Sequence, residues 1–194
     1  MTKIIAVCGP PGSGKSTLCS KIVKLLPASI YISMDRYQLM TEWDEFRLDL
    51  WCNHGCDYNE LPVPGLLERL ESLKNGQPLI GGNSSPSLDY IILESHIGRC
   101  STAMKKIIDF VFWLDLDFDL CLARALLAMT EGQKRYENYS TMISVDELDG
   151  YLSSYLSRTA KLLRIQRDRI KPDADLIISN PSAQTIINWI QTHT

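Results

Sequence analysis

Near the amino terminus, glycines, a lysine and a serine follow one another at a spacing that suits phosphate binding. The residues are Gly9, Pro10, Pro11, Gly12, Ser13, Gly14, Lys15, Ser16 and Thr17. Residues 9–16 read G-x-x-x-x-G-K-[ST]. In this motif backbone N–H groups surround phosphate oxygens, the lysine reaches the β- and γ-phosphates, and the serine hydroxyl binds Mg²⁺. We therefore expect residues 9–17 to bind a nucleoside triphosphate together with Mg²⁺.

The stretches on both sides match what this motif requires. Residues 3–8 are mostly apolar, as in a buried strand, and Leu18, Ile22, Leu25 and Leu26 recur at helical spacing after the motif. A helix that begins at the motif directs the positive end of its dipole toward the phosphates. A plain glycine turn beside a lysine is the alternative, and it does not explain the flanking strand and helix.

Two acidic residues stand at the ends of two further predicted strands. Residues 29–34 read as a strand that delivers Asp35, and residues 89–94 form a largely apolar run that ends in Glu94. Ligands of an open parallel sheet bind beyond the carboxyl ends of its strands. We therefore expect Asp35 to lie beside a substrate hydroxyl, and Glu94 to hold Mg²⁺ with Ser16, directly or through water.

A polar, charged segment over residues 130–142 is a candidate lid above the phosphates. Arg124, Lys134 and Arg135 are its candidate phosphate contacts, and a solvated surface is the competing interpretation of each. The apolar pattern that follows predicts one long helix over residues 145–170.

Composition and charge favour one α/β domain over residues 1–194, with no internal repeat or linker. The net charge of -3 and the pI near 5.6 argue against a duplex-binding surface, so we expect no nucleic-acid partner. No apolar run approaches the length of a membrane span, so we expect no membrane partner. The chain begins directly with a strand pattern and shows no secretory signal, which predicts a cytoplasmic location.

The cysteines also favour a reducing compartment. There are six, and two of them flank the phosphate-binding motif where burial is the simpler role. The spacing Cys52-x-His54-x-Cys56 could suggest zinc. No second ligand pair follows at structural-zinc spacing, which argues against that interpretation.

With these pieces in place, the chain resembles the uridine kinase-like group of P-loop kinases, which includes uridine/cytidine kinases, nicotinamide riboside kinases, phosphoribulokinase and bacterial pantothenate kinase. The segments that carry the resemblance, besides the motif, are Ile32–Tyr37, Asn53–His54, Asp57–Asn59, Leu66–Leu70, Ile91–Glu94, Phe112–Asp115, Leu122–Arg124 and Lys171–Ile178. The resemblance implies a three-layer P-loop fold. Its mostly parallel five-stranded sheet has the order 2-3-1-4-5, and a small helical lid accompanies it.

The resemblance also implies roles for particular residues in ATP-dependent phosphorylation of a small-molecule hydroxyl. Asp35 would orient the acceptor and take its proton, and Lys15 with the loop amides would stabilise charge on the transferred phosphoryl group. Arg124 and Arg135 would close over the phosphates. The candidate substrate-binding residues are Asp35, Tyr37, Asn53, His54, Tyr58 and Arg99.

Three departures separate the chain from uridine kinases, one of which is that Ala128 stands where their arginine-rich lid would have a second arginine. Residues 78–88 are too short for the hairpin that helps those enzymes hold the base, and Asn53 stands where their loop has a ribose-binding aspartate. Nicotinamide riboside kinases lack the hairpin and resemble this length better. The departures leave phosphotransfer in place and put uridine itself in question.

Three functions stay open at this point. A nucleoside-like kinase is favoured. A kinase of another small alcohol is the second, and an acidic acceptor would call on Arg36, Arg47 and Arg99. A nucleotide-dependent switch that hydrolyses ATP without a small acceptor is the third. A homodimer also stays open, because dimers are common among homo-oligomers and no stretch identifies an interface.

Overall fold

The computed structural model describes residues 2–77, 87–135 and 144–193, with the backbone alone at residues 41 and 130–135. Five strands form one sheet in the order β2-β3-β1-β4-β5, and every neighbouring pair is parallel. The strands are β1 (Lys3–Cys8), β2 (Ser29–Ser33), β3 (Tyr90–Glu94), β4 (Phe110–Leu114) and β5 (Leu176–Ile178). This order is the one predicted from the sequence.

The pairing register aligns the carboxyl ends of the first three strands. Glu94, the last residue of β3, is level with Val7 of β1 on one side and with Ser33 of β2 on the other. The chain leaves β1 into the glycine-rich loop and leaves β2 into Asp35. The loop, Asp35 and Glu94 therefore meet at one edge of the sheet, as expected for ligand binding in this architecture.

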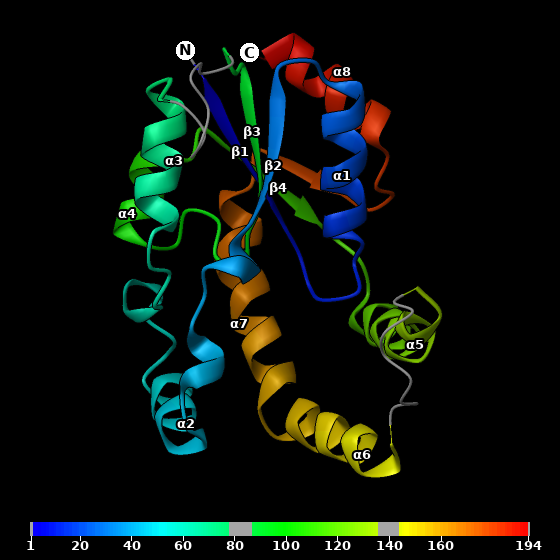
Figure 1. Ribbon diagram of the computed structural model, residues 1–194. Helices are drawn as coiled ribbons and strands as arrows, with labels where there is room; N and C mark the ends of the chain where they lie inside the picture. The colour runs from blue at the N-terminus through cyan, green and yellow to red at the C-terminus, as the bar shows by residue number, and fades with distance from the viewer. Residues whose placement is uncertain (1, 78–86, 136–143, 194) are drawn as a thin grey trace.

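Helices cover both faces of the sheet and complete the three predicted layers (Figure 1). On one face lie α1 (Lys15–Leu25) and α8 (Ala183–His193), and on the other α3 (Leu66–Lys74), α4 (Thr102–Ile107) and α7 (Ala160–Ile170). Because both faces are covered, the central strands are almost fully buried and their sequences are continuously apolar.

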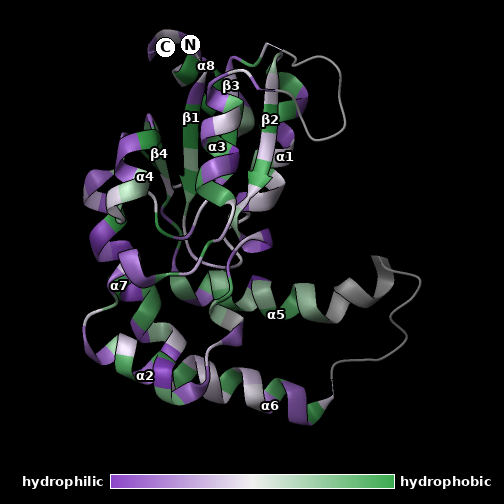
Figure 2. Ribbon diagram, turned by 60° about the vertical axis from the view of Figure 1, so that its left-hand side comes forward, coloured by the Kyte–Doolittle hydropathy of each residue, from purple (hydrophilic) through white to green (hydrophobic). Residues whose placement is uncertain are grey.

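The remaining helices lie beyond the carboxyl ends of the strands (Figures 1 and 2). They are α2 (Glu45–Asn53), α5 (Phe118–Arg135) and α6 (Val145–Ser154). These helices occupy the side of the sheet where the phosphate-binding loop opens. None of the described helices combines the length and the apolar character needed to cross a membrane.

The long helix predicted over residues 145–170 is wrong in one respect, because a π-helical turn at Tyr155–Thr159 divides it into α6 and α7. The Ser157 hydroxyl donates to the Ser153 carbonyl at 2.8 Å, and the Thr159 hydroxyl donates to the Ser154 carbonyl at 3.4 Å. Such side-chain bonds to a preceding carbonyl compete with the helical ladder and commonly bend a helix. Figure 1 shows the resulting change of direction between α6 and α7.

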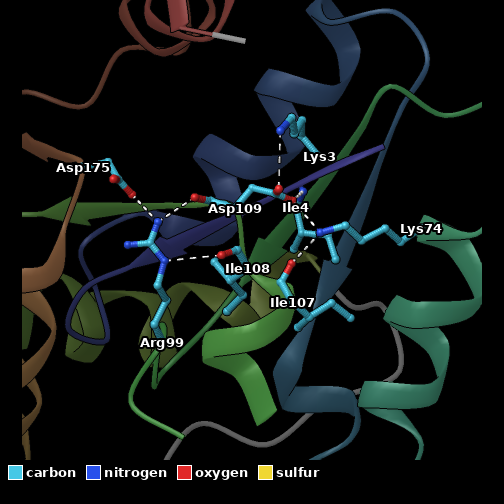
Figure 3. A network of polar contacts seen from close by, with 8 residues as sticks. All are labelled: Lys3, Ile4, Lys74, Arg99, Ile107, Ile108, Asp109 and Asp175. Atoms are coloured by element: carbon cyan, nitrogen blue, oxygen red, sulfur yellow. Dashed lines mark hydrogen bonds and ion pairs between the residues drawn. The ribbon is translucent and has the colours of Figure 1, made fainter. Parts of the chain in front are cut away.

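A polar network at the opposite end of the sheet ties the layers together (Figure 3). The Asp109 carboxylate, just before β4, accepts hydrogen bonds at 2.8 Å from the Ile4 backbone N–H and from Lys74 Nζ. Lys74 also donates to the Ile107 carbonyl at 2.9 Å, and Lys3 lies 3.5 Å from the other oxygen of Asp109. The Asp109 carboxylate thus joins the start of β4 to β1 and α3, and Lys74 extends the network to α4.

The pKa of Asp109 predicts a pH-dependent loss of stability on substitution. Burial raises this pKa, but the hydrogen bonds and charges of Lys74, Ile4 and Lys3 outweigh burial and leave it below the usual value. Asp109→Asn should lower the free energy of unfolding at neutral pH by about 2 kcal/mol, the usual size for a hydrogen bond to a charged group. Urea denaturation followed by circular dichroism measures this difference.

The sign of the pH dependence follows from the lowered pKa. The Asp109 contribution is complete above the unfolded-state pKa of about 4 and is lost as the pH falls further, so wild type and variant should converge in acid. Asp168→Asn is the matched control, because its carboxylate is exposed and pairs with its neighbour Arg167. A difference for Asp109→Asn that stays constant from neutral pH to pH 3 would contradict the assignment.

Candidate active site

The loop between β1 and α1 has the conformation that its glycines predict. Gly12 and Gly14 have φ angles of +79° and +89°, in the left-handed region that favours glycine. A Cβ atom on Gly12 would lie 2.0 Å from the backbone oxygen of Cys121 in α5, so this position also needs glycine for space. The first-turn N–H groups of α1 have no acceptor within the helix and are available to an anion at the loop.

Lys15 lies across this loop as a buried cation. Its side chain is 5% exposed, and Nζ donates to the Pro10 carbonyl at 2.9 Å. Burial lowers the pKa of Lys15, while the nearby carboxylate of Glu94 acts in the opposite direction. A triphosphate bound in the loop would add negative charge beside this ammonium group and favour its charged form.

Glu94 is held by hydroxyl groups from two neighbouring elements. The Ser16 hydroxyl of α1 donates to one carboxylate oxygen at 2.7 Å, and the Tyr31 hydroxyl of β2 donates to the other. Burial and the bond to Glu94 raise the pKa of Tyr31 to about 12, so its proton stays in place.

Ser16 and Glu94 present hard oxygen donors side by side, which is the ligand chemistry that Mg²⁺ prefers. Within the residues that the structure describes, no cluster of three or more His, Cys, Asp or Glu side chains could hold a metal alone. Mg²⁺ at this position would therefore take its remaining ligands from phosphate oxygens and water, as is usual for this ion.

Asp35 faces a histidine that the sequence analysis did not identify. Asp35 lies in the short turn Met34–Arg36 after β2, and its carboxylate contacts Nε2 of His96. The hydrogen bond from His96 is the main influence on the pKa of Asp35 and lowers it, while partial burial acts in the opposite direction. Asp35 is therefore ionised near neutral pH and can accept a proton. The available sequence signal was that His96 follows Glu94 by two residues, at the same edge of the sheet.

A cavity of about 690 Å³ connects these groups. Its phosphate side contains Pro11, Gly12, Gly14, Lys15, Ser16, Thr17, Glu94, Arg124, Ala125 and Ala128. Beyond Asp35 and His96 it is lined mainly by apolar and aromatic side chains with a few uncharged polar ones: Gln38, Met40, Trp51, Tyr58, Leu61, Ile97, Thr159, Leu162, Leu163 and Gln166. One cavity therefore joins a cationic, oxygen-rich end to an apolar end.

The structure brings some of the predicted site residues to this cavity and leaves others outside it. Asp35, Tyr58, Arg124 and Glu94 line it, together with most of the phosphate-binding loop. Three loop residues, Gly9, Pro10 and Ser13, are buried behind the lining. The side chain of Arg135, and most of the predicted lid at 130–142, lie outside the described residues.

Four predicted substrate-binding residues do not line the cavity. Asn53 and His54 are exposed at the end of α2, where Asn53 accepts from Lys161 Nζ at 3.3 Å, and Tyr37 packs against the core. The spacing of Asn53 and His54 resembles a family motif and predicted that they would contact the substrate. In the structure both lie at the exposed end of α2, outside the cavity lining.

Arg99, a predicted substrate-binding residue, lies away from the cavity. Its guanidinium donates to the Asp109 carbonyl at 2.6 Å and to the Asp175 carboxylate at 2.7 Å, at the amino ends of β4 and β5 (Figure 3). A further bond runs from Nε to the Ile108 carbonyl at 3.3 Å. These partners engage Arg99 at the end of the sheet opposite the cavity.

Comparison with known proteins identifies uridine kinases as similar along the chain. No protein-family model matches the chain. Uridine kinases of Staphylococcus aureus strains JH9 and Newman are 26% identical to it over an alignment of 214 positions, which covers 98% of this chain and 94% of theirs. This similarity confirms the resemblance to uridine kinase-like P-loop kinases over nearly the whole length.

Solved structures support the same architecture. A possible uridine kinase from Bacillus stearothermophilus superposes with a TM-score of 0.54 at 13% identity, covering 92% of this chain and 89% of that protein. A candidate kinase from Chloroflexus aurantiacus superposes with a TM-score of 0.52 at 16% identity, covering 100% and 98%. At these identities the likeness establishes the fold, and the curated relatives support kinase activity at the level of the family.

The contact between His96 and Asp35 gives a prediction that needs no substrate. His96→Ala should raise the pKa of Asp35, because the hydrogen bond that lowers it is removed. An NMR titration that follows the Asp35 carboxyl carbon measures the shift directly. His193→Ala, an exposed histidine on α8, is the control and should leave the titration unchanged. Identical Asp35 titrations in wild type and His96→Ala would rule out this contact in solution.

Proposed function

We propose that this chain, which resembles uridine kinases along nearly its whole length, is an ATP-dependent kinase that phosphorylates a hydroxyl group of a nucleoside-like molecule. The observation that supports this most directly is the shared cavity, in which Asp35 faces the same space as Lys15 and Glu94. Phosphoryl transfer needs a proton acceptor at one end of such a space and phosphate-binding groups at the other.

In this proposal, each described residue has a role that its surroundings support. Asp35 orients the acceptor hydroxyl and takes its proton, with His96 fixing the carboxylate. Lys15 and Arg124 stabilise negative charge on the transferred phosphoryl group. Ser16 and Glu94 hold Mg²⁺, which when bound supplies further neutralisation of phosphate charge. Most of the rate acceleration then comes from positioning and electrostatics.

The acceptor side of the cavity supports a substrate with a flat apolar ring. Trp51 and Tyr58 line it with their rings 5.8 Å apart, edge to face, and Leu61, Leu162 and Leu163 add aliphatic surface. Pockets of this composition bind heteroaromatic ligands through apolar contact, while a few polar groups fix orientation. A nucleoside combines such a ring with the hydroxyl that Asp35 requires.

The distribution of charge argues against an acidic acceptor such as a sugar acid. Among the described residues, Lys15 and Arg124 are the cavity-lining cations, and Arg124 sits in α5 beside the phosphate-binding loop. Arg47 lies over the ring of Trp43 at 4.3 Å, Arg99 pairs with Asp175, and Arg36 is absent from the lining. Neutral or cationic acceptors, including uridine, cytidine and nicotinamide riboside, suit this environment better.

An ADP-release assay with Mg-ATP and a panel of nucleosides, nicotinamide riboside, pantothenate, sugars and sugar acids tests the proposal. One acceptor or a few related ones should stimulate ADP release, and Asp35→Asn should reduce that rate by about 10²–10⁴-fold, the usual contribution of a general base. Asp168→Asn, on an exposed face of α7, should retain the rate. Slow ADP release that no acceptor stimulates and that Asp35→Asn does not change would instead indicate a nucleotide-dependent switch.

ATP affinity should distinguish the roles of residues at the two ends of the cavity. Lys15→Ala should weaken binding of ATP and lower turnover, because it removes the cation buried in the loop. Asp35→Asn should bind ATP as wild type does. Isothermal titration calorimetry with a non-hydrolysable ATP analogue measures both affinities, and equal weakening by the two substitutions would argue against the division of roles.

A further inference from the structure

Four residues of α7 and the π-helical turn before it present one stripe to the cavity. They are Thr159, Leu162, Leu163 and Gln166, at the i, i+3, i+4, i+7 spacing of one helix face. Gln166 is the last of them and is 7% exposed. A polar amide at an otherwise apolar position of this stripe needs hydrogen-bond partners to be tolerated there.

One half of the Gln166 amide has its partner, and that partner fixes the orientation of the other half. Nε2 donates to the backbone carbonyl of His96 at 2.5 Å. A carbonyl oxygen can only accept, so the NH₂ group of the amide must face it. Oε1 is consequently held on the other side as an acceptor, and rotating the amide to reverse the two atoms would set two acceptors against each other.

Oε1 is buried and has no hydrogen-bond donor within the part of the chain that the structure describes. Two potential donors that line the same cavity are engaged elsewhere. Trp51 Nε1 donates to the Asp57 carbonyl at 2.9 Å, and the Thr159 hydroxyl donates to the Ser154 carbonyl. An acceptor buried in this way is unfavourable unless a ligand or a water molecule supplies the missing donor.

We propose that Gln166 Oε1 accepts a hydrogen bond from the acceptor substrate, through an O–H or N–H group other than the hydroxyl that is phosphorylated. The proposal rests on the kinase function proposed above and narrows its substrate class to molecules that carry a second donor. Gln166 reaches the reacting end through His96, since its amide binds the backbone of the same residue whose ring contacts Asp35. The second donor therefore lies close to the phosphorylated hydroxyl.

Both a ribose hydroxyl and an N–H group of the heterocycle can donate the hydrogen bond to Gln166 Oε1, and substrate analogues distinguish between these two donors. The probes are uridine, 2′-deoxyuridine, 3′-deoxyuridine and 3-methyluridine, each of which lacks or blocks one donor relative to uridine. If another nucleoside gives the higher rate in the ADP-release assay, its corresponding analogues replace these. Wild type should use one analogue about 10- to 100-fold less efficiently in kcat/KM than the parent, as for one lost hydrogen bond to a buried acceptor.

Gln166→Met keeps the size of the side chain and removes both amide groups. The variant should show equal kcat/KM for the parent nucleoside and for the analogue that wild type rejects, while still distinguishing the other analogues as wild type does. Loss of the Nε2 bond to His96 affects all substrates alike, so the change in one ratio isolates Oε1. Gln184→Met, on the exposed face of α8, is the matched control and should keep the wild-type ratios.

The result that overturns the inference differs from the one that overturns the proposed function. If wild type is an active kinase and Gln166→Met rejects the same analogue by the same factor, a water molecule satisfies Oε1 and the inference fails alone. If no nucleoside stimulates ADP release, calorimetric affinities for the four probes provide the same comparison. If wild type phosphorylates no acceptor of the panel and binds none of its nucleosides, both proposals fail together.

Discussion

The position of the buried carboxylate of Glu94 is the constraint on which the rest of the site depends. A carboxylate that is 4% exposed is unfavourable unless its oxygens are hydrogen-bonded and its charge is balanced. The hydroxyls of Ser16 and Tyr31 bind its two oxygens, and Lys15 lies close enough for Glu94 to favour its charged form. Because these partners come from α1 and β2, satisfying Glu94 fixes the phosphate-binding helix against the strand that delivers Asp35.

The candidate site and the main polar network lie at opposite ends of the sheet. At the carboxyl ends, register aligns β1, β2 and β3, so that the loop, Asp35 and Glu94 converge, and Ser16 at the start of α1 bonds directly to Glu94. At the amino ends, Asp109 and Arg99 join strands and helices of neighbouring layers through hydrogen bonds (Figure 3). Since the ion pairs that fix the layers lie away from the cavity, the groups at the cavity are available for a ligand.

Sequence reasoning succeeded where a local pattern carries a physical requirement. The glycine-rich loop and the apolar strands that lead to Asp35 and Glu94 follow from short stretches that have few alternative structures, while the sheet order followed from the family resemblance. It failed where the decisive partner is distant in sequence. Arg99 pairs with Asp175, and Gln166 and His96 meet across 70 residues, so no spacing rule identifies either contact. The break between α6 and α7 was missed because its cause is hydroxyl competition within a pattern that remains helical.

That break comes directly before the residues of α7 that line the cavity. A π-helical turn accommodates one extra residue, and one residue rotates everything after it by about 100° around a helix axis. The stripe that ends at Gln166 begins at the last residue of this turn and faces the cavity, while Arg158 of the turn itself is held by Asp49 of α2 at 2.7 Å. The phosphate end of the cavity thus follows a sequence motif, whereas the acceptor end includes α7, which Arg158 and Lys161 link to Asp49 and Asn53 of α2. Within one P-loop architecture, substrate preference can therefore change through α7 and α2 while the phosphate-binding machinery stays the same.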